Sequence, residues 1–339
     1  MQFKQPFICN FKENLNTNTW VAAPDDTSWY QQSLHFNLYY QPPYIWSAMI
    51  DYLGKRAIPG VETVQNHHYA RTVLLHSPFS HRTVKGWLRV KENLESNALT
   101  VEMSASLVPE WRKVVQRLRH LFDLDVSPEI ITTTLNEPWV TQGLRVPGAF
   151  NGFELGVRAI LGQQITVKAA TTLSGRLVHA LGTPFETGIE GLDTLFPIPE
   201  AFVQLMHGET PIADILGPLG ITGRRSNTIA ALAEALVNGQ VYLNPLVKGV
   251  ENDFSSASHN AQMQAAEAEM QQLLAIKGIG NWTAQYIGMR ALGYTDSFLE
   301  TDIGIKNAMP NYETSKARLA ASEAWRPLRS YAVVNLWNM

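Results

Sequence analysis

The sequence predicts an α+β protein in which a small antiparallel-sheet domain precedes a larger all-α domain. From residue 35 to about 104, apolar residues alternate with a period of two, which is typical of half-buried strands. After about residue 132 they recur at helical spacing, with Gly- and Pro-bearing turns between the helices. The length of 339 residues fits two or three domains. We therefore expect a mostly irregular extension (1–34), an α+β domain (35–131) and an all-α domain (132–339).

The expected elements of the α+β domain follow one another as strand, helix, strands and helix. Pro42 and Pro43 end the first strand, FNLYY, and Trp46, Met49 and Leu53 then recur at helical spacing. Three strand candidates come next: VETV with YARTVLL, then TVKGWLRV, then ALTVEMS. One face of the closing helix is apolar, and its residues are Trp111, Val114, Val115, Leu118, Leu121 and Phe122.

The all-α domain is expected to contain one long or broken helical region followed by shorter helices. The long region is FELGVRAILGQQITVKAATTLSGRLVHAL. The shorter helices are PEAFVQLM, RRSNTIAALAEALV and AQMQAAEAEMQQLLAI.

Composition narrows the class of protein. No run of eighteen apolar residues predicts a membrane span, and the N-terminus lacks the pattern of a signal peptide. Cys9 is the only cysteine, which excludes an internal disulfide, a cysteine-rich zinc site and an iron–sulfur cluster. His67, His68 and His76 do not have the spacing of metal ligands. These features favour a reducing, cytoplasmic setting.

The net charge of −3 argues against nucleic-acid binding, because most nucleic-acid binders carry a basic surface. Backbone amides and helix dipoles can nevertheless bind phosphate without net positive charge. The charge alone therefore favours a small-molecule enzyme but leaves a DNA-binding protein open.

A glycine-containing hairpin between two helices is the most informative local motif. In LLAIKGIGNWTAQYIGMRAL, one helix ends near Ile276 and the next begins near Asn281. Glycine allows positive φ and close backbone approach, so the amides of Gly278, Gly280 and Thr283 are expected to form a site for one phosphate. A plain helix connection with a glycine cap is the simpler alternative.

Asp302 follows the second of these helices and opens another helix. A helix N-cap without chemical function is the ordinary role of such an aspartate. The same position suits catalysis, because the helix dipole favours the ionised carboxylate. One carboxylate can stabilise an oxocarbenium-like sugar and position or deprotonate a water.

The segment from Ile276 to Lys306 resembles the helix-hairpin-helix, glycine/proline-rich loop and aspartate signature of DNA glycosylases. More closely, the chain resembles the bacterial DNA-3-methyladenine glycosylase II family, the AlkA type. The other similar stretches are YYQPPYIWSAMIDYLGKRAIPGVETV, ASLVPEWRKVVQRLRHLFDLDVSPEII, LRVPGAFNGFELGVRAILGQQITVKAA and WRPLRSYAVVNLW. Together they cover about nine-tenths of the chain in the family's order.

The resemblance implies the family's fold and activity. The expected fold is a TBP-like antiparallel-sheet domain followed by a helix-hairpin-helix glycosylase domain. The implied enzyme hydrolyses N-glycosyl bonds in base excision repair, acting as a monomer on double-stranded DNA that contains alkylated bases. It flips the base out of the duplex and needs no cofactor. A bacterial, nucleoid-associated, cytoplasmic location without membrane contact is implied as well.

The family's functional residues carry over one by one. The catalytic aspartate falls on Asp302. The positions implied for the base pocket are Trp282, Tyr286, Trp337 and Tyr52. The positions implied for DNA binding are Gly278, Gly280, Thr283, Gln163, Gln164 and Lys306. The family also binds a monovalent cation such as Na⁺ or K⁺ through hairpin carbonyls, which here would be those of Leu274, Ile276 and Ile279.

Trp282 predicts the subtype. Related enzymes that also nick the strand carry a lysine at this position, which forms a Schiff base with the sugar, and tryptophan cannot do so. Lys277 of the hairpin is expected to face phosphate or solvent. The resemblance therefore implies a monofunctional glycosylase.

Three positions depart from the family's pattern. Gln164 stands where the wedge residue is usually apolar. Thr301 replaces a second acid before Asp302, and Ile303 replaces an aromatic after it. These changes make the pocket less rich in electrons and affect the expected range of substrates. Among the basic residues, Lys168 and Lys306 are phosphate candidates, while Arg224 and Arg225 favour a solvated helix start.

Two alternatives remain at this point. The first is a helix-hairpin-helix DNA-binding protein that has lost catalysis or changed its specificity, which an intact Asp302 disfavours. The second is an oxidised-purine glycosylase/lyase, which the absence of lysine at position 282 disfavours.

Overall fold

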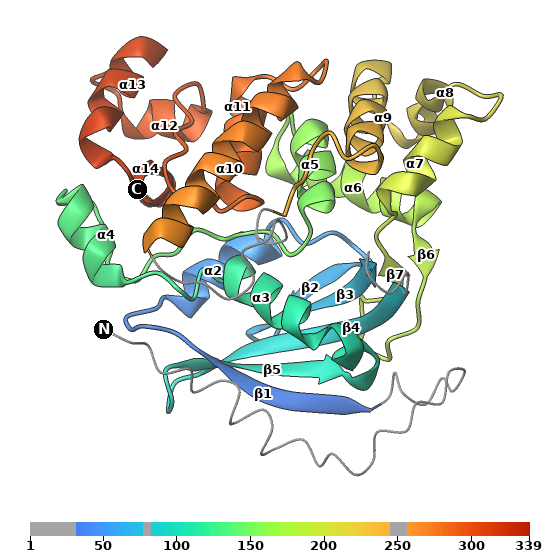
Figure 1. Cartoon of the computed structure of the whole chain (residues 1–339), viewed down its shortest axis with the longest axis horizontal. Helices are drawn as coiled ribbons and strands as arrows, with labels where there is room; N and C mark the ends of the chain where they lie inside the picture. Colours follow the sequence, from blue (N-terminus) through green and yellow to red (C-terminus); the bar gives the residue numbers. More distant parts are fainter. Residues whose placement is uncertain (1–31, 77–82, 245–255) are drawn as a thin grey trace.

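The computed structural model describes residues 32–76, 83–244 and 256–339 (Figure 1). Most of the extension expected at 1–34 lies outside the described residues. The first strand already begins at Ser33, two residues before the predicted start of the α+β domain. Among the described helices, none is long and apolar enough to cross a membrane.

The N-terminal part contains a five-stranded antiparallel sheet, as predicted. Its spatial order is β1-β5-β4-β3-β2. The strands are β1 (Ser33–Tyr39), β2 (Glu62–Gln65), β3 (His68–His76), β4 (Thr83–Asn93) and β5 (Ala98–Ser104). Leu38 pairs with Leu99, and Val90 pairs with Val101, so buried apolar residues lie opposite one another across three strands.

The first predicted strand candidate, VETV with YARTVLL, is a hairpin of two strands. Asn66 and His67 form its turn at φ values of 50° and 61°. Two successive residues at positive φ match the twist of the flanking strands, and asparagine tolerates this conformation. His67 therefore lies in the turn between β2 and β3 and not on a strand.

Two helices complete the core of the sheet. They are α2 (Trp46–Gly54) and α3 (Trp111–Leu121), and both occur where the apolar spacing predicted a helix. Trp46, Met49 and Leu53 of α2 are buried with Leu118 of α3 in one cluster with the strand residues. In Figure 1, α2 runs between the sheet and the C-terminal helices, which places its residues at the border of the two parts.

The C-terminal part is mainly helical and has its own core. Its helices are α4 (Pro128–Leu135), α5 (Gly152–Leu161), α6 (Val167–Leu181), α7 (Pro199–Met206), α8 (Ile212–Leu216), α9 (Gly223–Val237), α10 (Ser256–Ala275), α11 (Asn281–Arg290), α12 (Ile303–Ala308), α13 (Ser315–Ser322) and α14 (Arg329–Trp337). Helix α5 is buried almost throughout and contacts α6, α9 and α11. Ile131 of α4 belongs to this core, although the expected border at residues 131–132 falls inside that helix.

The expectation of an all-α second domain needs one correction. A two-stranded sheet of β6 (Thr183–Pro184) and β7 (Thr194–Leu195) lies within it. Strands of two residues are too short to produce an alternating pattern that the sequence could reveal. A bridge between Gly60 and Leu192 joins this region to the N-terminal part.

The long helical region predicted from residue 153 to 181 is broken. Helix α5 ends at Leu161, and α6 begins after Thr166, whose hydroxyl accepts a hydrogen bond from the amide of Ala169. A threonine N-cap favours the start of a new helix at this position, so α6 is separate from α5 and does not continue it. The five residues between the two helices form a partly exposed loop that includes Gln163 and Gln164.

Candidate active site and nucleic-acid interface

Asp302 is the N-cap of α12, as its sequence context predicted. Its Oδ1 accepts hydrogen bonds from the amides of Gly304 at 2.9 Å and Ile305 at 3.3 Å. Two indole N–H groups also bind the carboxylate: Trp337 donates to Oδ1 at 2.9 Å and Trp282 donates to Oδ2 at 3.0 Å. Oδ1 thus accepts three hydrogen bonds and Oδ2 accepts one within the described protein. The carboxylate is fixed in orientation, while Oδ2 keeps room to accept a proton or another hydrogen bond.

Four aromatic side chains from three helices meet at this carboxylate, and we call them the aromatic cluster: Tyr52, Trp282, Tyr286 and Trp337. Trp282 and Tyr286 are four residues apart on α11 and stack with centroids 5.0 Å apart at 10°. Tyr52 of α2 and Trp337 of α14 also stack, at 6.4 Å and 19°. The hydroxyls of Tyr52 and Tyr286 lie 3.3 Å apart. The structure therefore brings together all four positions expected for the base pocket.

Arg290 binds the tyrosine half of this cluster. Its Nη1 donates to the Tyr286 hydroxyl at 2.7 Å, and its guanidinium lies 4.8 Å from the centroid of the Tyr52 ring. Its Nε and Nη2 donate to the carbonyls of Pro147 at 2.7 Å and Gly148 at 3.0 Å. The side chain is thus buried and held by three hydrogen bonds, so it is a fixed charge beneath the tyrosines.

Further arginines surround the two tyrosines and shift their pKa values in opposite directions. Burial is the main cause that raises the pKa of Tyr52 to about 12. Burial also opposes the ionisation of Tyr286. Hydrogen bonding from Tyr52 and the charges of Arg290, Arg56 and Arg158 outweigh it and lower the pKa of Tyr286 to about 7.

Arg290 and Arg56 were not predicted as site residues from the sequence. A signal was present, since each arginine follows a pocket tyrosine by four residues: Arg290 after Tyr286 on α11, and Arg56 after Tyr52 in the turn that ends α2. The guanidinium of Arg56 lies 3.7 Å from the centroid of the Tyr52 ring. The four-residue spacing that pairs Trp282 with Tyr286 therefore also brings an arginine to each tyrosine of the cluster.

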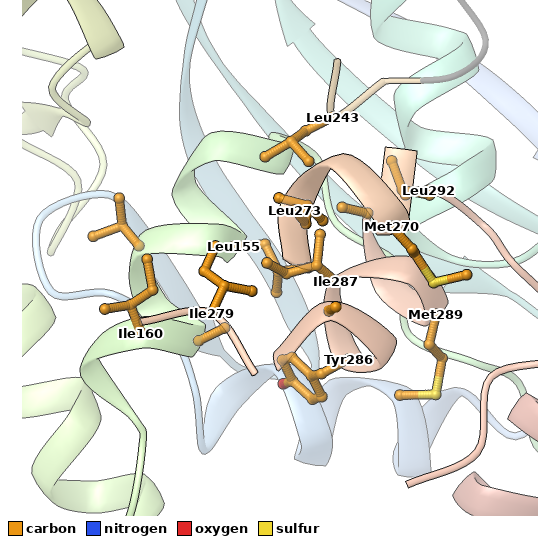
Figure 2. Packing of buried hydrophobic residues seen from close by; sticks show 14 of the residues in the cluster. Leu155, Ile160, Leu243, Met270, Leu273, Ile279, Tyr286, Ile287, Met289 and Leu292 are labelled. Atoms are coloured by element: carbon orange, nitrogen blue, oxygen red, sulfur yellow. The ribbon is translucent and has the colours of Figure 1, made fainter. Parts of the chain in front are cut away.

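The two glycines of the hairpin between α10 and α11 meet different structural requirements. Gly278 has φ of +100°, and a Cβ there would lie 2.0 Å from Oγ1 of Thr228. Gly280 has φ of −98° as the N-cap of α11, and nothing lies within 4 Å of the position of its Cβ. Ile279 between them is buried, and Figure 2 shows it in one packed cluster with residues of α5 and α10. The core thus anchors the hairpin, while Gly280 leaves open space at the start of α11.

The loop between α5 and α6 is tied to this hairpin. Gln163 Nε2 donates to the carbonyl of Gly278 at 3.0 Å and to the hydroxyl of Thr283 at 3.2 Å. Arg225 donates in turn to the carbonyl of Gln163, so it does not simply open a solvated helix. Gln164 is exposed and has φ of +59°, a conformation that costs energy for a residue other than glycine. Gln163 therefore links protein segments, and Gln164 is the residue that projects.

The lysine candidates all lie on the surface. Lys168, Lys277 and Lys306 are exposed. Of the carbonyls expected to hold a cation, that of Ile276 accepts a hydrogen bond from the amide of Ile279 at 3.0 Å. A carbonyl oxygen has two lone pairs, so this bond still leaves it able to bind a cation.

The two departures beside Asp302 are both on the surface. Thr301 is exposed, and Ile303 is 68% exposed although it is apolar. Neither side chain contributes to the aromatic cluster.

Two known families match consecutive parts of this chain. Residues 35–151 match the AlkA N-terminal domain, and residues 157–330 match the HhH-GPD superfamily base excision DNA repair protein. The chain is 31% identical to the DNA-3-methyladenine glycosylase 2 of Escherichia coli (strain K12) over 303 residues. That alignment covers 89% of this chain and 96% of the relative.

Solved structures share the fold at low sequence identity. The 3-methyladenine DNA glycosylase from Archaeoglobus fulgidus superposes with a TM-score of 0.67 at 19% identity, covering 89% of this chain and 97% of that one. The Clostridium acetobutylicum 8-oxoguanine glycosylase/lyase superposes with a TM-score of 0.57 at 16% identity, covering 87% and 90%. The domain plan is therefore common to both kinds of glycosylase, and the sequence match narrows the choice. The chain belongs to the HhH-GPD superfamily and, within it, to the family of the AlkA-type DNA-3-methyladenine glycosylase II.

Proposed function

We propose that this protein is a monofunctional DNA glycosylase that excises alkylated bases, of the 3-methyladenine and 7-methylguanine type, from duplex DNA in base excision repair. The observation that carries this proposal is the carboxylate of Asp302, held by the indoles of Trp282 and Trp337 at the edge of the aromatic cluster. A carboxylate next to a stack of aromatic rings offers a negative charge to the sugar and ring faces to a cationic base.

The reaction needs only one bond to break and one to form. The bond between C1′ of the sugar and the base nitrogen breaks, and its electron pair leaves with the base. Because an alkylated base carries a positive charge, it departs neutral and needs no general acid. The carboxylate of Asp302 stabilises the oxocarbenium-like sugar, and a water then adds to C1′. Oδ2 accepts the proton of that water, since it carries one hydrogen bond where Oδ1 carries three.

Trp282 supports hydrolysis without strand cleavage. A lyase step requires an amine that attacks C1′ and forms a Schiff base. Position 282 holds an indole whose nitrogen donates to Asp302, so it orients the carboxylate and does not attack the sugar. Lys277, the lysine of the hairpin, lies on the exposed side of that turn. We therefore expect an abasic site with an intact strand as the product.

The DNA contacts follow from the hairpin and its neighbouring loop. The open space at Gly280 lets a phosphate approach the first amides of α11, including that of Thr283, and the amide of Gly278 completes the site. Gln164 projects from its loop and fills the gap that the flipped nucleotide leaves. Lys306 on α12, near Asp302, and Lys168 on α6 add phosphate contacts from exposed positions.

A monovalent cation, Na⁺ or K⁺, completes the proposed hairpin. The carbonyls of Leu274, Ile276 and Ile279 are the groups that would hold it, and carbonyl oxygens suit hard cations. Its role would be to brace the turn that presents the amides to phosphate. We propose that the protein acts as a monomer in the bacterial cytoplasm, where the chromosome lies.

A base-release assay on methylated duplex DNA tests the function. We expect the wild-type protein to release 3-methyladenine and 7-methylguanine, and to cut the strand only after treatment with alkali. Asp302→Asn keeps an N-cap, because asparagine and aspartate are equivalent caps. This variant should fold and bind DNA but lose at least about 10³-fold in the rate of release, since it removes the charge that stabilises the sugar.

Asp51→Asn is the matched control, since Asp51 is an exposed carboxylate that pairs with Lys55 on α2. Its rate should equal that of the wild type. Release by Asp302→Asn at the wild-type rate would refute the mechanism. No release by the wild-type protein would refute the function and favour a binding protein. Strand cutting without alkali would favour a glycosylase/lyase.

A further inference from the structure

An arginine-rich cavity of about 40 Å³ lies beside the tyrosine half of the aromatic cluster, because its lining residues Arg56 and Arg290 contact Tyr52 and Tyr286. Its lining contains four arginines and two glutamates, which are Arg56, Arg71, Arg158, Arg290, Glu62 and Glu154. Arg71 lies 2.7 Å from Glu154 and 3.7 Å from Glu62. Four positive charges thus face two negative ones, and the other three arginines are those without a direct contact to either carboxylate.

These three arginines make no ion pair with a carboxylate within 4.0 Å among the residues that the structure describes. Arg158 is 9% exposed, its Nη2 donates to the hydroxyl of Thr171 at 2.9 Å, and its Nη1 has no hydrogen-bond partner. Buried charge without a partner is costly. A negative charge close to this group would be strongly stabilised.

The hydroxyl of Tyr286 is placed to be stabilised as an anion. Arg290 can only donate, so the hydroxyl oxygen of Tyr286 accepts its hydrogen bond. The other partner within the described protein is the hydroxyl of Tyr52, and either oxygen of that pair can be the donor. A phenolate on Tyr286 therefore keeps both contacts, since it accepts from Arg290 and from Tyr52 beside arginines that no carboxylate pairs.

We propose that Tyr286 ionises in the folded protein and sets the preference of the site for cationic over neutral damaged bases. This inference rests on the proposed function and names a specificity-determining residue for it. The ring of Tyr286 stacks on Trp282, so its charge lies in the wall that a flipped base would contact. A phenolate there attracts a positively charged base, whereas the phenol leaves the charges of the arginines uncompensated and disfavours it.

Groups from every neighbouring element enter this balance. Helix α2 contributes Tyr52, and the turn after it contributes Arg56. Helix α5 contributes Arg158, and Arg290 lies on α11 one turn from Tyr286. Glu62 acts on Arg158 and Arg290 from the start of β2, and Asp302 lies across Trp282. The arginines predominate and lower the pKa of Tyr286 to about 7 against the opposing effect of burial. The phenolate therefore forms as the pH rises through about 7, and the phenol returns below it.

The decisive experiment compares two substrates across pH 6 to 8. One is duplex DNA with 3-methyladenine, whose base is cationic, and the other carries hypoxanthine, which is neutral. For the wild-type protein we expect the ratio of excision rates, 3-methyladenine over hypoxanthine, to rise about tenfold with an inflection near pH 7. For Tyr286→Phe this inflection should disappear. Acid assistance to the departure of hypoxanthine affects both proteins equally, so it cancels when the two profiles are divided.

Two further measurements separate an ionising tyrosine from a structural one. The ultraviolet absorbance of tyrosinate should show one group titrating near pH 7 in the wild type and none there in Tyr286→Phe. Tyr52→Phe removes one donor from the phenolate, so its inflection should move to higher pH. Equal pH profiles for wild type and Tyr286→Phe, with 3-methyladenine released by both, would overturn this inference and leave the proposed function standing. No release by the wild type would overturn the function itself.

Discussion

The two halves of the aromatic cluster bind groups of opposite charge. The tryptophan half, Trp282 and Trp337, donates two indole hydrogen bonds to the carboxylate of Asp302. The tyrosine half, Tyr52 and Tyr286, receives the guanidinium of Arg290. Indole nitrogens can only donate, and phenol oxygens can accept, so the residue type on each side decides which charge it holds. The difference teaches that, under the proposed function, chemistry on the sugar and selection of the base belong to different sides of one aromatic cluster.

The difference also concerns rigidity. Asp302 is capped on the amides of its own helix, and two neutral indoles from within 35 residues complete its hydrogen bonds. Arg290 depends on carbonyls of residues more than 140 positions away in the sequence. The tyrosine half should therefore contribute more to stability and the tryptophan half more to catalysis.

The largest expected effect on stability is that of Arg290→Met. The substitution leaves the carbonyls of Pro147 and Gly148 and the hydroxyl of Tyr286 without their buried donor. We expect a loss of about 3 kcal/mol in the free energy of unfolding, measured by urea denaturation. Arg318→Met is the control, because that buried arginine also donates three hydrogen bonds, all to carbonyls, but lies outside the aromatic cluster. It should destabilise the protein to a similar extent without changing the preference between bases. A wild-type unfolding curve for Arg290→Met would show that the tyrosine half is not a structural centre.

A smaller effect, on catalysis, is expected for Trp337→Phe. This change keeps an aromatic ring but removes one charge-assisted hydrogen bond to Oδ1 of Asp302. The rate of base release should fall about tenfold, which corresponds to about 1.4 kcal/mol, with little change in unfolding. Trp139→Phe serves as the control, since Trp139 packs edge-to-face against Trp325 and is not a ligand of Asp302. Equal rates for the two variants would mean that the indole does not orient the carboxylate.

The smallest effect is expected for Arg56→Gln. Arg56 is partly exposed, and its guanidinium lies over the ring of Tyr52. Solvent screens such a charge, so we expect less than about 1 kcal/mol of destabilisation by urea denaturation. Because this charge favours the Tyr286 phenolate, the inflection in the excision ratio should nevertheless move to higher pH. An unchanged inflection in a folded variant would remove Arg56 from the set of groups that control Tyr286.

The features predictable from the sequence are those that a short segment determines. The N-cap at Asp302 depends on amides two and three residues later, and the stack of Trp282 on Tyr286 depends on helical spacing. The sheet followed from the alternation of its strands. The resemblance to a family supplied Tyr52 and Trp337, which spacing alone could not bring to Asp302.

The features that escaped prediction depend on contacts between distant segments. Thr228 approaches Gly278 from another helix, and Arg290 reaches the carbonyls of a loop before α5. The side chain of Gln163 bonds the hairpin, and no pattern within the loop indicates that partner. The two-residue strands β6 and β7 are too short to leave a periodic signal.

The bond from Gln163 to the hairpin has a geometric consequence. It connects the segment that would hold a phosphate to the segment from which Gln164 projects. The two segments are therefore held at a fixed separation. Under the proposed function, one would contact the backbone of the duplex and the other the position that the flipped base leaves. We then expect the number of nucleotides between these two contacts to be set by the protein and to be the same for every sequence that it inspects.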